Sequence, residues 1–378
     1  MADRYWVGGG ANTNWATAGN WSASSGGAGG ATVPTSADNV FFTGVGVNSN
    51  GTSTIGTATT ILSLSITAGF TGTIAHNFAL TIVTNVTLGA NYNITGGAAL
   101  TISGTSNMTS NGRTWPGSLS FTGTATKTLV DNWTVTGLVS NNGTTTLNGN
   151  TLYMGSSLSM TGGGLVAGGT TLLIFQGTGT WSGPGVVNNN LTFGGTCLIT
   201  LSGSVQYGSG TFTHVVGSMI TTGATISFTG STYNSPGTFW DNVNVTGTMT
   251  LYSTLSAYEM TLMGNVTFAG THAISVSFLY NNQAGTAATI TFQEGLYYYI
   301  EQGFFGYQTR IGAILHFTSS SATNRAFFTL LSDTEINLLA SFTRMEAIGR
   351  PVRTFNGTVT DCINIFEFHD IPTMAATF

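Results

Sequence analysis

A short strand motif recurs along most of this chain at intervals of about 20 residues, with two apolar residues flanking a residue that is often Thr or Ser. The copies are Leu80-Thr81-Ile82, Leu100-Thr101-Ile102, Leu119-Ser120-Phe121, Leu152-Tyr153-Met154, Leu172-Leu173-Ile174, Leu191-Thr192-Phe193, Ile226-Ser227-Phe228, Val243-Asn244-Val245 and Met260-Thr261-Leu262. Alternation is typical of a strand, and a fixed period in this range is typical of a solenoid. The motif therefore predicts an all-β fold, a single-chain β-solenoid (β-helix) that adds one coil per repeat.

Two intervals in this series are longer than the others, and each is expected to contain a weaker copy. These weaker copies are Trp133-Thr134-Val135 and Phe212-Thr213-His214. Because side chains alternate across a strand, the first and third residues of each copy should point into the core. The predicted inward residues include Leu80, Ile82, Leu100, Ile102, Leu172, Ile174, Leu191 and Phe193.

Charged residues are scarce and unevenly placed. They make up 6% of the chain, against 41% hydrophobic residues, whereas about 25% is usual for a globular domain. Between Asn39 and Gln293 the charged residues are Arg113, Lys127, Asp131, Asp241 and Glu259. A stacked coil explains this scarcity, because equivalent positions lie only ~4.8 Å apart and repeated like charges would repel.

The chain divides into three predicted regions. Residues 1–42 are rich in glycine and contain Trp6, Trp15 and Trp21. A solenoid must cover the open edge of its first coil, so we interpret this segment as a cap or anchor, with an aromatic sugar-binding patch as the alternative. Residues 43–293 are the coils. Residues 294–378 carry more charge and form a C-terminal β region of final coils, an oligomerisation segment, or both.

An aromatic run lies near the start of the C-terminal region. Strand alternation cannot bury all of its members in one coil interior. Aromatic residues are enriched at protein interfaces, so we predict an intersubunit contact, with receptor or sugar contact and extra core as the alternatives. The run consists of Tyr297, Tyr298, Tyr299, Phe304, Phe305 and Tyr307.

The sequence offers no pattern for catalysis, a metal or a cofactor. Glycoside hydrolysis usually needs two carboxylates ~5–10 Å apart, and the closest sequence pair, Asp333 and Glu335, lies in a charged stretch that favours a solvated surface. The histidines His76, His214, His272, His316 and His369 form no metal-binding pattern. Cys197 and Cys362 are isolated from each other, which predicts no disulfide framework.

The charge and hydropathy patterns exclude two further classes of function. The net charge is −5 and there is no basic stripe, so we expect no nucleic-acid partner. No apolar run approaches the ~20 residues of a membrane span. The first residues lack the basic and apolar regions of a signal peptide, from which we expect synthesis in the cytoplasm.

Both ends of the chain carry segments of a recognisable kind. These are Trp6-Val7-Gly8-Gly9-Gly10, Asn20-Trp21-Ser22 and 33–41 at the start, and Ile290-Thr291-Phe292, 315–320 and Ile365-Phe366-Glu367-Phe368 near the end. They resemble a family of β-solenoid surface proteins found in bacteriophage virions and among autotransporter-like adhesins. The resemblance implies a homo-oligomer, in particular a homotrimer.

Together these observations favour a non-enzymatic structural protein on the surface of a bacteriophage virion, either a tail fibre or spike or a capsid decoration. Such a protein would be made in the host cytoplasm and would contact other virion proteins, with a host cell-surface glycan as a further candidate partner. The absence of a signal peptide speaks against the first alternative, a bacterial adhesin. The scarcity of carboxylates speaks against the second, a polysaccharide-degrading tailspike.

Overall fold

The computed structural model describes residues 1–143, 145–148, 150–161, 165–168, 172–195, 197–214, 218–270, 272–281, 289–292, 297–306, 314–317, 327–330, 336–337, 345–347, 355–356 and 366–368. Over these residues the chain is all-β apart from one 3-10 turn, η1 (Ala18–Asn20). Stacked parallel strands amounting to about 11 turns in the described part confirm the predicted β-solenoid. The chain forms two compact units, Met1–Thr200 and Leu201–Phe378. The predicted boundaries at 42/43 and 293/294 stay predictions.

The first unit starts with a small sheet built around its first strand. β1 (Ala2–Trp6) pairs in parallel with β3 (Asp38–Phe42) and antiparallel with β2 (Trp21–Ser22). β3 then begins the stack of coils.

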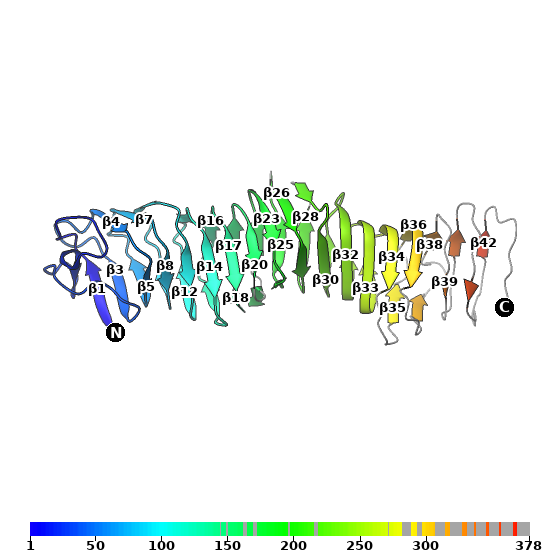
Figure 1. Ribbon diagram of the computed structural model, residues 1–378, viewed down its shortest axis with the longest axis horizontal. Helices are drawn as coiled ribbons and strands as arrows, with labels where there is room; N and C mark the ends of the chain where they lie inside the picture. Colours follow the sequence, from blue (N-terminus) through cyan, green and yellow to red (C-terminus); the bar gives the residue numbers. More distant parts are fainter. Residues whose placement is uncertain are drawn as a thin grey trace. The chain divides into compact units, whose positions relative to one another are not determined.

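Each coil of the first unit contributes three short strands, one to each side of a three-sided coil (Figure 1). The first side consists of β3, β6 (Ser63–Ile66), β9 (Val86–Thr87), β12 (Ser106–Thr109), β15 (Lys127–Leu129), β18 (Thr145–Asn148), β21 (Leu165–Gly168) and β24 (Val186–Val187). The second side has one sheet of β4 (Thr52–Ile55), β7 (Thr73–His76) and β10 (Asn93–Thr95), and then β13 (Thr114–Trp115), β16 (Trp133–Val135), β19 (Leu152–Met154), β22 (Leu172–Phe175) and β25 (Asn190–Phe193). The third side consists of β5 (Thr59–Ile61), β8 (Leu80–Ile82), β11 (Leu100–Ile102), β14 (Leu119–Thr122), β17 (Val139–Asn142), β20 (Leu158–Met160) and β23 (Thr178–Ser182).

The sequence motif mixes strands from different sides of the coil. Leu80, Leu100 and Leu119 are true equivalents on the third side, and the next equivalent is Val139. Trp133, predicted to fill the first long interval, pairs with Leu152 on the second side. The second weaker copy, Phe212-Thr213-His214, lies in a strand that pairs with β25, the strand of Leu191-Thr192-Phe193. Both weaker copies are therefore confirmed as strands stacked on members of the series, and the long intervals are steps from one side of the coil to another. All three sides alternate apolar and small polar residues, so the motif does not distinguish them.

The predicted inward residues are confirmed except for two residues of one strand. Leu80, Ile82, Leu100, Ile102, Leu191 and Phe193 are buried. Leu172 and Ile174 are only half-buried, and Leu173 and Phe175 point inward in their place. The four residues of β22 are all apolar, so alternation alone cannot fix their facing. Pairing with β25 fixes it, because Phe175 stacks on Phe193 with ring centroids 5.2 Å apart.

The second unit is also built from parallel coils. β27 (Ser204–Tyr207), β30 (Thr225–Thr229), the long β32 (Phe239–Leu251) and β33 (Leu255–Gly270) stack in that order. β28 (Thr211–His214) pairs with β31 (Thr232–Asn234), which pairs with the far end of β32. The remaining strand of this part is β29 (Ser218–Ile220), and the strand at the boundary of the units is β26 (Leu198–Ser202).

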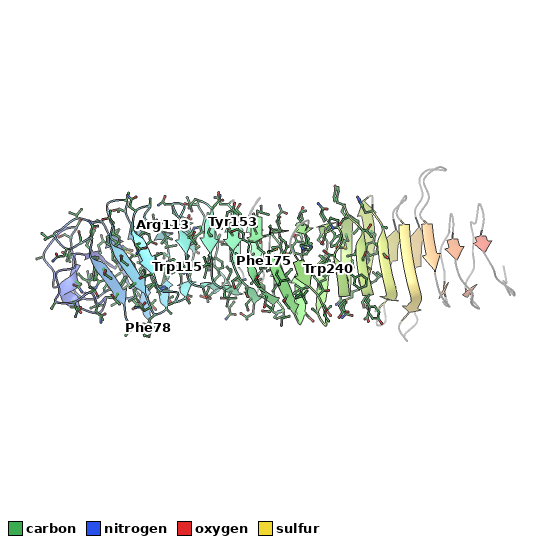
Figure 2. The ribbon with its side chains drawn as sticks, turned by 90° about the horizontal axis from the view of Figure 1, so that it is seen from above. Phe78, Arg113, Trp115, Tyr153, Phe175 and Trp240 are labelled. Atoms are coloured by element: carbon green, nitrogen blue, oxygen red, sulfur yellow. The ribbon has the colours of Figure 1, made fainter. Side chains whose placement is uncertain are left out.

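Four aromatic side chains fill the interior of these coils. Phe212, Phe228, Tyr233 and Trp240 lie with ring centroids 5.5–6.0 Å apart. The indole Nε1 of Trp240 donates a hydrogen bond of 2.8 Å to the Tyr233 hydroxyl. Trp240, labelled in Figure 2, is thereby fixed in the interior, and the side chain of its neighbour Phe239 lies on the outside.

The later strands of the second unit continue the parallel pairing. They are β34 (Ile274–Asn281), β35 (Thr289–Phe292), β36 (Tyr297–Gly306), β37 (Ile314–Phe317), β38 (Phe327–Leu330), β39 (Ile336–Asn337), β40 (Met345–Ala347), β41 (Phe355–Asn356) and β42 (Phe366–Phe368). β33 pairs with both β34 and β35, and β34 pairs with β36.

Candidate functional surface

The three tryptophans of the N-terminal segment lie together in the interior. Trp21 packs edge-on against both Trp6 and Trp15, with ring centroids 5.3 and 4.8 Å apart. Its Nε1 donates to the carbonyl oxygen of Trp15 at 2.6 Å. Phe42 from the first coil packs against all three rings. All three rings are covered, so none offers a face to a sugar; their role as a cap stays a prediction.

Four of the five charged residues in the coils form hydrogen bonds with backbone groups through their side chains. Asp131 accepts hydrogen bonds from the N–H groups of Ser110 and Asn111 at 2.7 and 2.6 Å. Asp241 accepts one from the N–H of Gly223 at 2.6 Å. The guanidinium of Arg113 lies over the Tyr92 ring and donates to the Tyr92 carbonyl oxygen. These charges therefore serve the fold, and sequence spacing alone does not show their partners.

Lys127 is the fourth, and its side chain is fully buried. Its Nζ donates to the carbonyl oxygens of Thr122 and Ala125, each at 3.0 Å. Burial lowers the pKa of this ammonium group, because removal from water disfavours the charged form. A buried amine that no substrate can reach is a structural group, and here it satisfies two carbonyl groups of a tight turn.

His76 is buried against Trp115, with ring centroids 4.8 Å apart. Burial lowers the pKa of His76 to about 4, and a backbone hydrogen bond with Ala98 opposes this shift only in part. Among the described residues its Nε2 has no hydrogen-bond partner. The imidazole is therefore neutral at physiological pH and acts as part of the core.

His214 belongs to a buried hydroxyl cluster in the second unit. Its Nδ1 lies 2.6 Å from the Thr238 hydroxyl and 3.3 Å from the Ser235 hydroxyl, and the two hydroxyl oxygens are 2.7 Å apart. Serine–histidine pairs occur in nucleophilic catalysis. The Ser235 side chain, however, is completely buried and open to no substrate. Burial also lowers the pKa of His214. The cluster is a core polar network.

A ladder of hydroxyl groups runs along the outer face of the third side. Register places seven of them on successive coils, and the Ser140 hydroxyl donates to that of Ser120 at 3.0 Å. Stacked hydroxyls provide a polar surface without charge repulsion. The ladder consists of Thr60, Thr81, Thr101, Ser120, Ser140, Ser159 and Ser182.

An exposed apolar strip interrupts the polar surface of the second unit. Phe239 and Tyr258, on β32 and β33, are 58% and 45% exposed. Ile220, at the end of β29, is 43% exposed, and the hydroxyl of its neighbour Thr221 donates to the Phe239 carbonyl oxygen at 3.0 Å. We call Ile220, Phe239 and Tyr258 the aromatic strip. Sequence reasoning missed it, because its members become neighbours only when coils stack.

Two carboxylates lie beside the aromatic strip. In the pairing of β32 with β33, Trp240 lies opposite Ala257 and Asn242 lies opposite Glu259. Asp241 therefore lies opposite Tyr258, and Glu259 is the next residue along β33. The carboxylate of Glu259 makes no hydrogen bond or ion pair within the described part of the chain. Stacking thus brings together two acidic residues that lie 18 positions apart in the sequence.

The predicted interface residues fall on or beyond β36. Tyr297, Tyr298, Tyr299, Phe304 and Phe305 belong to this strand, and Tyr298 pairs with Ile274 of β34. The surroundings of their side chains, and Tyr307 itself, lie outside the described residues. The same holds for Asp333, Glu335, Cys362 and His369.

Within the described residues no three histidine, cysteine or acidic side chains come together as a metal site would require. None of the described segments is a helix with the length and apolar character needed to cross a membrane.

Comparisons of the chain with protein-family models, with curated proteins and with solved structures give no match.

Proposed function

We propose that this chain is a non-enzymatic structural protein on the surface of a bacteriophage particle, either a tail fibre or spike or a capsid decoration. The observation that carries the proposal is the strict register of the third side, with an uncharged hydroxyl ladder outside and apolar residues inside. Such a surface stays hydrated without charge. The placement on a phage particle is supported by the resemblance of the two ends of the chain to β-solenoid virion proteins.

The test is to locate the protein on purified phage particles. Gold-labelled antibody against the chain should decorate the tail or the shell in electron micrographs, and the protein should co-purify with particles through a density gradient. Particles from a phage that lacks the gene are the control. Absence from washed particles, together with abundance in the cell lysate, would contradict the proposal.

We also propose that the chain assembles as a homotrimer and contacts other virion proteins. The support is the aromatic run 297–307, of which strand alternation cannot bury every member in one coil interior. Light scattering at micromolar concentration should give three times the mass of the single chain. Replacing Tyr297, Tyr299 and Phe305 together by serine should lower that mass if the run forms the contact. A monomeric mass for the unmodified protein would count against assembly.

A further inference from the structure

We propose that the aromatic strip, together with Asp241 and Glu259, is a binding site for an uncharged oligosaccharide. This inference rests on the proposed surface function, because a protein displayed on a particle can meet the glycans of a cell surface. The strip is a set of large apolar side chains exposed on neighbouring coils, on a surface where Ser, Thr and Asn are frequent. Exposed apolar side chains that adjoin one another and are rimmed by polar residues are a feature of ligand-binding surfaces.

The spacing of the two rings suits consecutive sugar units. Phe239 lies opposite Ser256 on the next coil, and Tyr258 is two residues further along the same strand. Two residues of strand and one coil step separate the two positions by about 8 Å. The small side chain of Ser256 lies between them. The apolar C–H face of a pyranose can pack on each ring, so the strip can hold two or three sugar units.

The carboxylates supply the polar half of the site. One oxygen of Asp241 accepts the N–H of Gly223, and the other makes no hydrogen bond within the described part of the chain. Glu259 follows Tyr258 directly and is partly exposed. Carboxylate oxygens accept hydrogen bonds from hydroxyl groups. A glycan stacked on the rings would therefore find acceptors for its hydroxyls at one edge.

The charge around the strip selects for an uncharged ligand. The described residues of the second unit include no lysine or arginine, and the two groups beside the strip are both acidic. A sugar acid would bring its carboxylate next to Asp241 and Glu259, and no cation of the described part lies there to offset the repulsion. Glycans built from neutral hexoses or N-acetylhexosamines avoid this cost.

The size of the strip argues against a second copy of the chain as the occupant. A stable protein interface buries about 800 Å² per partner over 20–30 residues. Three partly exposed side chains offer only a fraction of that area, because a whole aromatic side chain provides roughly 150–250 Å². The face around them is made of short polar residues. The strip is therefore too small for a self-interface and large enough for a short oligosaccharide.

The experiment uses the full chain and a surface-immobilised panel of oligosaccharides of two to four units. One half of the panel contains neutral hexoses and N-acetylhexosamines, and the other half contains uronic or sialic acids. We expect binding within the neutral half only. Phe239→Ala and Tyr258→Ala should each weaken it about tenfold or more. Tyr252→Ala removes an equally exposed aromatic residue outside the strip and should leave binding unchanged.

Three results would overturn the inference. They are no binding to any neutral oligosaccharide, equal loss of binding in the Tyr252→Ala variant, and a change of oligomeric mass in Phe239→Ala without any change in glycan binding. Melting curves of each variant establish that the coil is intact. Failure here is distinguishable from failure of the proposed function, because gold labelling of particles does not depend on glycan binding.

Discussion

Replacing Ile102 by aspartate should lower the free energy of unfolding by about 4 kcal/mol or more, a large fraction of the stability of an ordinary domain. Ile102 is fully buried, between Ile82 on the preceding coil and Phe121 on the following one. A carboxylate there would be buried between these two apolar side chains of the neighbouring coils. The loss should appear in urea unfolding followed by circular dichroism.

The matched control is Thr101→Asp, one position away on the same strand. Thr101 lies outward on the hydroxyl ladder, between Thr81 and Ser120. Its replacement introduces a single solvated charge, and we expect a loss of about 1 kcal/mol or less. Equal losses for the two variants would contradict the assignment of facing on the third side.

Acidification should destabilise the first unit through His76. The pKa of this imidazole is about 4 in the folded protein, against 6.5 when exposed. Because the unfolded chain binds a proton more readily, the contribution of His76 to stability is complete above pH 6.5. It is lost progressively as the pH falls toward 4. The difference in pKa corresponds to about 3 kcal/mol.

The measurement compares the unmodified protein with His76→Leu at pH 7.5 and pH 4.5. Other acidic and histidine groups titrate in both proteins, so the difference between them isolates His76. The unmodified protein should lose about 2.5 kcal/mol more than the variant over this interval, since the loss is not yet complete at pH 4.5. Parallel pH dependence in the two proteins would show that His76 is already charged, or already exposed, in the folded state.

The sequence predicts the strands well where their alternation is unambiguous. Leu80-Thr81-Ile82 and Leu100-Thr101-Ile102 face as expected, because one polar residue between two apolar ones permits a single arrangement. Leu172 and Ile174 do not, because an entirely apolar strand can face either way. The sides of the coil cannot be separated from sequence, since each repeats the same local pattern.

Buried and clustered polar groups are harder to predict. Lys127 occupies an inward position that strand alternation with Leu129 would indicate, but its charge argues for solvent. The carbonyl oxygens that stabilise it belong to a turn whose conformation the sequence does not specify. The aromatic strip depends on which residues of successive coils become neighbours. That register follows from the lengths of the turns, and no single residue determines it.

The strict register of the third side means that the length of the stack can change only in steps of one whole coil. Leu119 and Val139 occupy the same position on successive coils. Excision of residues 119–138 would bring Val139 into the place of Leu119 and shorten the stack by one step of ~4.8 Å, while every remaining strand keeps an equivalent neighbour. Duplication of the same block would lengthen it by the same step. Deletion or duplication of one repeat in the gene can therefore change the length of the stack by whole coils, while the core packing of the remaining coils stays the same.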